Sequence, residues 1–199
     1  MTRVCLVGEE DVTLQYELLS RETAREALST YDLHEPFANA VGVETVSLGA
    51  AVALLNDLEW YLVRFVSEAM VLEPSVSEDE WLSRALAMAV RDDELAPEET
   101  GRFLKIYGLE SAEPGGNEAV DGGTAPVDGE SGDDGGTAPV DGESGDDGEG
   151  SDEGVRGAGV RQLVEPMYVT RTGEDLPDYD LREVDGTLVE RVTESEFGA

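Results

Sequence analysis

The feature that most constrains the fold is an acidic, glycine-rich stretch, residues 111–160, which divides the chain into two unequal parts. It contains the unit GGTAPVDGESGDD twice in succession, at residues 122–134 and 135–147, without one change. The stretch holds 15 of the 23 glycines and no aromatic residue. Such a segment cannot bury enough apolar surface to offset the entropy lost on ordering, so we predict a disordered linker. Foldable sequence is therefore confined to residues 1–110 and 161–199.

Residues 1–110 alternate between strand-like and helix-like patterns. Short apolar runs rich in β-branched and aromatic residues predict strands at residues 3–8, 43–48, 60–66 and 101–109. Helical spacing and composition predict helices at residues 21–31, 49–58 and 77–93. Ser77 and Glu80 form a capping box that predicts the start of the last helix. Residues 12–19 fit a strand or a helix, and the pattern leaves both alternatives open.

This order of elements predicts an α/β (α+β) domain over residues 1–110. It is compatible with a ferredoxin-like split βαβ sheet that carries an extra short helix between its middle strands. A three-layer α/β arrangement is the alternative.

Residues 161–199 have a β pattern of their own. Residues 161–171 predict a strand, and residues 179–192 predict a β-hairpin around a type I′ turn at Asp185 and Gly186. A segment of this length with one hairpin is marginal alone. We therefore expect it to dock on residues 1–110 in cis, or on a second chain in trans.

The chain is strongly acidic in every part. Its formal net charge is −33, from 46 acidic and 13 basic residues, and Lys105 is the only lysine. Residues 1–110 alone carry −14 and residues 161–199 carry −6. Such repulsion opposes a compact state at low salt but is largely screened at molar salt. The composition therefore favours a halophilic protein, with an acidic mesophilic protein that has a disordered tail as the alternative.

The same charge limits the possible partners. Phosphate groups of nucleic acids and anionic membrane surfaces both require clustered basic residues, which the chain lacks, so we expect neither as a partner. The start, MTRVCLVGEED, has no pattern of a secretory signal, and the apolar stretch 45–56 is too short to span a bilayer. These observations predict a soluble, cytoplasmic protein.

No motif identifies a catalytic, cofactor-binding or metal-ligating residue. His34 is a lone histidine in a loop, and Cys5, the only cysteine, has the pattern of a small buried residue in a strand. Gly8 follows a strand, but neither a G-x-G-x-x-G fingerprint nor a Walker lysine accompanies it. The acidic repeat lacks the ligand spacing of an EF-hand, and residues 91–94 are interpreted as a solvated helix end. We expect no cofactor and no metal site.

Two groups of residues remain as functional candidates. Glu9, Glu10 and Asp11 directly follow the first predicted strand, a position where α/β proteins often place functional side chains. The second group consists of the large aromatic residues Trp60, Tyr61 and Trp81. Such residues more often form the core or anchor an interface than stack against a ligand.

Several stretches of residues 1–110 carry a resemblance to a known group of proteins. They are MTRVCLVGEEDV, YELLSRETAREAL, TVSLGAAVALLNDLEWYLVR, EWLSRALAMAVRDDE and GRFLKIYG, with DLPDYDLREVDGTLVERVTESEFG in the C-terminal part. In these stretches the chain resembles an uncharacterised family of halophilic archaeal proteins of unknown function. The resemblance implies a halophilic origin and a cytoplasmic location, and it transfers no activity and no functional residue.

The interpretation that follows is a non-enzymatic binding, regulatory or protein-interaction module, which binds a protein partner or a small effector or acts as a homo-oligomer. The alternative is a small enzyme with a carboxylate-based site near Glu9, Glu10 and Asp11. An exposed apolar patch or an open sheet edge would favour the first. A pocket beside these three acids, with a raised carboxyl pKa, would favour the second.

Overall fold

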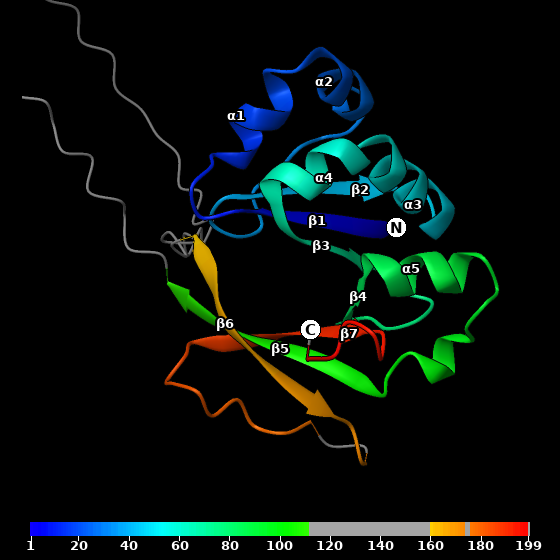
Figure 1. Ribbon diagram of the computed structural model, residues 1–199, viewed down its shortest axis with the longest axis vertical. Coiled ribbons are helices and arrows are strands. Elements are labelled where there is room, and N and C mark those ends of the chain that lie inside the picture. Colours follow the sequence, from blue (N-terminus) through cyan, green and yellow to red (C-terminus); the bar gives the residue numbers. More distant parts are fainter. Residues whose placement is uncertain (112–159, 174–175, 199) are drawn as a thin grey trace, which may run out of the picture. The chain divides into compact units, whose positions relative to one another are not determined.

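The computed structural model describes residues 1–111, 160–173 and 176–198, which belong to one compact unit (Figure 1). Residues 112–159 of the predicted linker lie outside the described residues, so the linker stays a prediction.

The described residues form a mixed α/β structure, as predicted. The strands are β1 (Thr2–Gly8), β2 (Ala40–Thr45), β3 (Val66–Leu72), β4 (Trp81–Ser83), β5 (Phe103–Ser111), β6 (Arg161–Thr170) and β7 (Gly186–Val192). The helices are α1 (Leu14–Leu19), α2 (Glu22–Leu28), α3 (Leu48–Asp57), α4 (Glu59–Phe65) and α5 (Arg84–Arg91), followed by a 3-10 turn, Pro97–Glu99.

All seven described strands share one sheet in the order β2-β1-β3-β4-β7-β5-β6. Neighbours are antiparallel except β4 and β7, which are parallel. β2 and β3 flank β1 and both run antiparallel to it, so they are parallel to each other, and α3 and α4 connect them. The ferredoxin-like arrangement is not confirmed, because β1 and β2 are direct neighbours and β7 lies inside the sheet. The pattern of residues 1–110 could not show a strand that comes from the other end of the chain.

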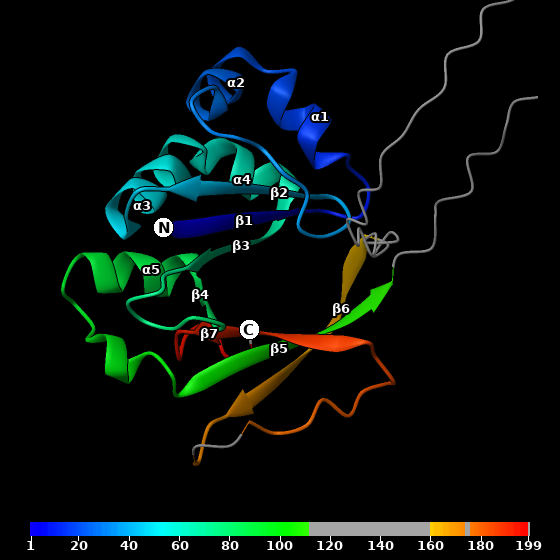
Figure 2. The ribbon, with the colours of Figure 1, turned by 180° about the vertical axis from the view of Figure 1, so that it is seen from behind.

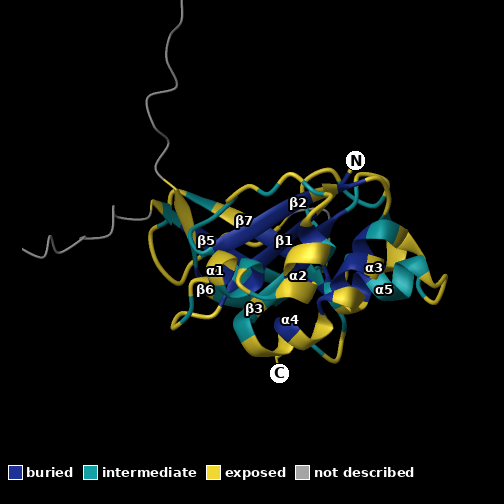
Figure 3. Cartoon of the chain, turned by 90° about the horizontal axis from the view of Figure 1, so that it is seen from above, coloured by how far each residue is buried: buried dark blue, intermediate teal, exposed yellow. Residues whose placement is uncertain are grey.

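The sheet is curled, and each of its faces is covered. On one face, residues of α1 to α5 pack against Val4, Leu6 and Val71. On the other face, Cys5 and Met70 of β1 and β3 pack against residues of β5 and β7. Figures 1 and 2 accordingly show α1 to α4 on one side of β1, β2 and β3, with β5, β6 and β7 on the other side. Figure 3 shows the central strands buried and the outer turns of the helices exposed.

The helix alternative holds for residues 12–19, where Leu14 and Leu18 of α1 are both buried at helical spacing. The predicted strand at residues 60–66 is wrong, because these residues form α4 and the strand β3 follows. In α4, Tyr61 and Leu62 are buried, whereas the residues on either side of this pair are exposed. Packing against the core thus overrides a composition that is typical of strands.

The predicted helix at residues 77–93 begins later than its capping box indicates. Ser77 Oγ does accept a hydrogen bond from Glu80 N at 3.1 Å, but this contact closes a turn that leads into β4. The helix α5 is capped instead by Ser83, whose Oγ accepts from Leu86 N at 3.2 Å.

The predicted hairpin at residues 179–192 is also wrong. β7 begins at Gly186 and pairs with β5 and β4, not with the residues before it. Asp185 is not the first residue of a turn between two strands, since none of the residues described between β6 and β7 forms a strand. Its carboxylate accepts hydrogen bonds from Ser111 N and Oγ at 3.0 and 2.9 Å. The preceding chain crosses the outer face of β5, where a Cβ on Gly108 would lie 2.6 Å from Val184 Cγ1.

A buried carboxylate ties β6 and β7 to the N-terminal part of the sheet. Glu80, directly before β4, accepts hydrogen bonds from Arg171, just after β6, and from Arg191 of β7. The three side chains are 11%, 19% and 12% exposed. Burial alone would raise the pKa of Glu80, but the hydrogen bonds from the two arginines outweigh burial and hold that pKa below its usual value.

Removing the charge of Glu80 should therefore destabilise the protein. In Glu80→Gln, two largely buried guanidinium groups lose their counter-charge, which costs about 3 kcal/mol of unfolding free energy. Urea unfolding at pH 7 measures this loss. Glu98→Gln, at an exposed position nearby, is the matched control and should leave stability unchanged. Equal stability of Glu80→Gln and the parent chain would contradict a structural role for this link.

The pairing register of β5 and β6 leads to a second prediction, which concerns the length of the chain between them. Ser111 and Arg161 are opposite each other, so the chain between them connects two adjacent strand ends. Replacing residues 113–159 with Gly-Asn-Gly leaves a five-residue hairpin loop. Because a shorter loop costs less entropy to close, we expect unfolding free energy to stay constant or rise by up to about 2 kcal/mol. Urea unfolding of the shortened and full chains tests this, and a clear loss of stability would show that the replaced residues support the fold.

Candidate functional site

The inner face of the curled sheet holds a cluster of titratable side chains. Strand alternation turns Lys105 and Tyr107 of β5 to the same face, and the register places Lys105 directly opposite Glu190 of β7. Glu68 of β3 and Cys5 of β1 complete this inner cluster. Four strands that are distant in sequence thus contribute to it.

Lys105 is the only cation within the inner cluster. Its Nζ forms an ion pair with Glu68 Oε1, and the two side chains are 12% and 22% exposed. The same Nζ lies 5.0 Å from the ring centroid of Tyr107 and 5.7 Å from that of Tyr168 on β6. Although burial opposes its charge, the hydrogen bond to Glu68 prevails and raises the pKa of Lys105, so this lysine stays protonated.

Glu190 is the most deeply buried charged residue in the part of the chain that the structure describes. It is 1% exposed, and its Oε2 has no hydrogen-bond partner. Burial, followed by the negative charge of Glu68, raises the pKa of Glu190 well above its usual value, although Lys105 acts in the opposite direction. Because the Lys105 ammonium is paired with Glu68, the Glu190 carboxyl group is expected to hold a proton.

The uncharged members of the inner cluster are held neutral. Burial, with the charges of Glu68 and Glu190, raises the pKa of Tyr107. Burial and Glu190 raise the pKa of the Cys5 thiol to about 12. A thiol of this kind is not an activated nucleophile. The residues of the inner cluster line neither of the two cavities described below.

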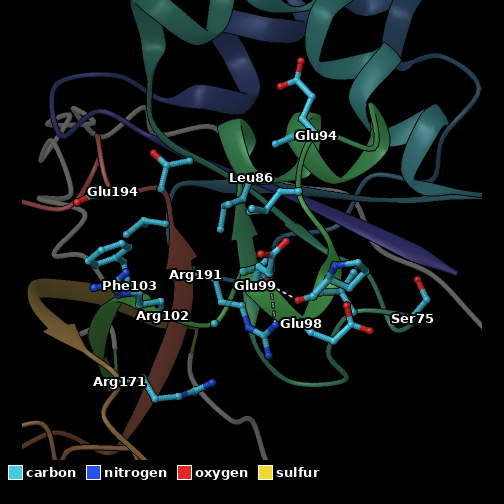
Figure 4. Close-up of a pocket in the computed structure, with 18 of the residues that line it drawn as sticks. Ser75, Leu86, Glu94, Glu98, Glu99, Arg102, Phe103, Arg171, Arg191 and Glu194 are labelled. Carbon is cyan, nitrogen blue, oxygen red and sulfur yellow. Dashed lines mark hydrogen bonds between the residues drawn. The ribbon is translucent and has the colours of Figure 1, made fainter.

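The larger cavity is an open groove of about 1140 Å³ between α5, the 3-10 turn and the ends of β5 and β7 (Figure 4). Apolar side chains such as Leu86 and Phe103 line it together with Arg171 and Arg191. Both arginines are already bound by Glu80, and Arg191 Nη1 also donates to Thr100 Oγ1 at 2.8 Å. The groove therefore has no free cationic cradle at these two arginines, and its geometry does not identify a ligand.

The outer face of α4 presents an aromatic and basic patch. Trp60 is 52% exposed and Val63 81% exposed. The guanidinium carbon of Arg64 lies 4.4 Å from the Trp60 ring centroid, and that of Arg21 lies 4.7 Å from the Phe65 ring centroid. We term Arg21, Trp60, Val63 and Arg64 the α4 patch.

The three acids singled out in the sequence do not form a site with a cavity. Glu9, Glu10 and Asp11 are exposed, and they line neither of the two cavities. The preceding residue, Gly8, is buried, and a Cβ on it would lie 2.5 Å from Asn39 Nδ2, so close packing explains this glycine.

His34 lies beside β2 and lines the second cavity, a hollow of about 420 Å³, with Met1, Tyr31 and Glu44 among its neighbours. Its backbone forms an isolated β-bridge with Gly42. Within residues 1–111, 160–173 and 176–198, no group of three His, Cys, Asp or Glu side chains is placed to hold a metal ion. No helix among the same residues has the length and apolar character needed to cross a membrane.

The aromatic candidates have different positions. Tyr61 is buried in the core, Trp81 lies at the β4–β7 pairing, and Trp60 belongs to the α4 patch. Sequence reasoning missed Glu68, Lys105 and Glu190 as a group. The one available signal was the position of Lys105, the only lysine of the chain. It lies in a strand-like pattern, on the strand face that also carries Phe103 and Tyr107.

Comparison with known proteins gives a family and no activity. No curated protein and no solved structure matches the chain. A family model described as a family of unknown function, DUF5804, matches residues 2–109, which include β1 to β4, α1 to α5 and most of β5. More than half of the chain is thereby covered, and the chain belongs to the DUF5804 family.

Proposed function

We propose that this protein is a non-enzymatic protein-interaction module and that the α4 patch is its contact surface. The observation that carries the proposal is the half-exposed Trp60, held between other side chains on the outer face of a helix. Tryptophan and arginine are the residue types most enriched at the energetic centres of protein interfaces.

The α4 patch is already ordered before a partner arrives. Tyr61 packs edge-on against Trp60 with ring centroids 5.0 Å apart, and Phe65 does so at 6.1 Å. Arg64 covers part of the same indole ring. Side chains that are held in place lose less conformational entropy on binding, which favours affinity.

The charges of the α4 patch suggest the chemistry of the partner. Arg21 forms an ion pair with Glu17 at 2.8 Å, whereas Arg64 has no carboxylate within 4.0 Å among the described residues. In a chain of net charge −33, the α4 patch thus presents a guanidinium without a described carboxylate partner beside a half-exposed tryptophan. A partner surface that combines an apolar side chain with a carboxylate would match it.

The alternative function, an enzyme acting through Glu9, Glu10 and Asp11, has less support. A raised carboxyl pKa beside these three acids would have favoured the enzyme. The raised carboxyl pKa is instead that of Glu190, which is buried in the inner cluster. A second copy of the chain is a possible partner for the α4 patch and is one outcome of the test below.

Substitutions in the α4 patch test the interaction. Trp60→Ala and Val63→Glu should each abolish or weaken partner capture at least tenfold, measured as recovery of a defined partner from extracts at native salt. Val46→Glu is the matched control, since Val46 is similarly exposed, at 83%, but lies in the bend between β2 and α3. Light scattering of the purified chain distinguishes self-association from binding to another protein. Unchanged capture and unchanged mass in both patch variants would contradict the proposal.

We also propose a halophilic, cytoplasmic origin, supported by the acidity of every part of the chain. Raising KCl from 0.1 to 2 M shortens the Debye length from about 10 Å to below about 3 Å and screens repulsion among surface carboxylates. We therefore expect the melting temperature, followed by circular dichroism, to rise substantially over this range. A melting temperature that is the same at both salt concentrations would count against a halophilic origin.

A further inference from the structure

Among the described strands, β4 is held by the shortest pairings: two residue pairs join it to β3 and two join it to β7. β7 pairs with β5 over seven residues, but with β4 only through Trp81–Glu190 and Leu82–Arg191. We term these two residue pairs the β4–β7 seam. The seam joins a part made of β1 to β4 to a part made of β5, β6 and β7, and Glu190 lies directly on it.

We propose that opening of the β4–β7 seam is linked to the loss of one proton. The seam is closed while the buried carboxyl group of Glu190 holds a proton, beside the Lys105 ammonium that is paired with Glu68. When Glu190 is ionised, the seam opens and exposes the apolar inner face of the sheet. The inference is independent of the function proposed for the α4 patch.

The groups around Glu190 leave its negative charge uncompensated. β5 contributes Lys105 and the neutral Tyr107, β3 contributes Glu68, and β1 contributes the neutral Cys5. From the turn after β7, Glu196 adds a further negative charge.

The remaining neighbouring strands add no further cation at this position. Tyr168 of β6, which carries no basic group, lies opposite Lys105. β4 contributes Trp81, Leu82 and Ser83, none of which carries a charge. Arg3 of β1 is exposed, with its guanidinium carbon 5.9 Å from the Trp81 ring centroid. Among the described residues, Lys105 is therefore the only cation near Glu190, and it is already paired with Glu68.

The stored proton acts on the seam because of where Glu190 lies. An ionised Glu190 would leave a buried charge whose Oε2 has no donor, and such a charge is strongly unfavourable in a protein interior. Opening the seam lets water reach the carboxylate. The β5–β7 pairing can stay intact during this motion, since it is longer and does not depend on β4.

The sign of the pH dependence follows from the raised pKa of Glu190. The closed state retains its proton at a pH where an open, solvated glutamate, with a pKa of about 4.3, has lost its own. Closure is thus fully favoured below about pH 4.3 and weakens as pH rises towards the pKa of the closed state. For one proton, the opening constant should rise by up to about tenfold per pH unit within this window.

Trp81 is a probe placed on the seam itself. With Trp60→Phe, Trp81 becomes the only tryptophan of the full-length chain. Acrylamide quenching of its fluorescence, measured from pH 5 to pH 9 at constant ionic strength, should increase with pH. The reactivity of the single, buried Cys5 towards a thiol reagent, corrected for its thiolate fraction, gives a second measure of opening.

Glu190→Gln in the same background separates the inner cluster from other titrations. This variant remains neutral, so its Trp81 quenching should stay at the low-pH level throughout. Glu44→Gln is the control, since Glu44 is an exposed glutamate on β2, and it should follow the parent chain. A parent chain with pH-independent quenching, or a Glu190→Gln variant that follows the parent, would overturn the proposal.

Lys105→Met provides a test that does not require Glu190→Gln to fold. Without the ammonium, an ionised Glu190 in the closed state has lost the cation that acts against its raised pKa, so that pKa rises further. The opening constant should then keep rising to a higher pH than in the parent, by up to about tenfold per pH unit. The same pH dependence in Lys105→Met and in the parent would show that Lys105 does not act on Glu190, and would equally overturn the proposal.

Discussion

The pairing of β7 with both β4 and β5 is the interaction on which the rest of the structure depends. β4 and β5 are not paired with each other, so β7 alone carries the sheet from one to the other. Its side chains then serve both faces: Glu190 enters the inner cluster, and Arg191 binds Glu80. The curl of the sheet, the enclosed apolar face and the charge links all require this strand to be in place.

The position of β7 shows that the family match covers only part of the sheet. The match ends at residue 109, before β6 and β7, yet these strands complete the sheet that the matched residues begin. The chain can insert a long acidic stretch between β5 and β6 because their ends are adjacent, and loop-closure entropy grows slowly with length. An insertion at this position disturbs no pairing in the sheet.

The sequence predicts those strands and helices that are determined by the local pattern of residues. The strands predicted at residues 3–8, 101–109 and 161–171 are present, because short runs of β-branched, aromatic and other apolar residues favour a strand locally. α4 was mistaken for a strand, since its aromatic and β-branched residues satisfy both patterns and only the packing of Tyr61 and Leu62 decides between them.

The inner cluster could not be predicted for a related reason. Lys105 was visible as the only lysine, but its partners come from β3 and β7, and strand order is a long-range property. The position of Glu190 depends on the placement of β7 between β4 and β5 in the sheet. No local sequence pattern indicates that placement. The acidic composition hid it further, because one buried glutamate cannot be distinguished by sequence among so many exposed acids.

The charges of this chain therefore act in two separate environments. Carboxylates on the surface repel one another through water, where dissolved ions screen the repulsion. Glu190 and Lys105 are largely buried, at 1% and 12% exposure, and ions reach them far less. Salt should then act on the compactness of the whole chain, whereas pH in the neutral range should act on the seam beside β7. Salt concentration and pH thus act on different groups, so the effect of each can be measured while the other is held constant. A dependence of the structure on both follows from the fold itself.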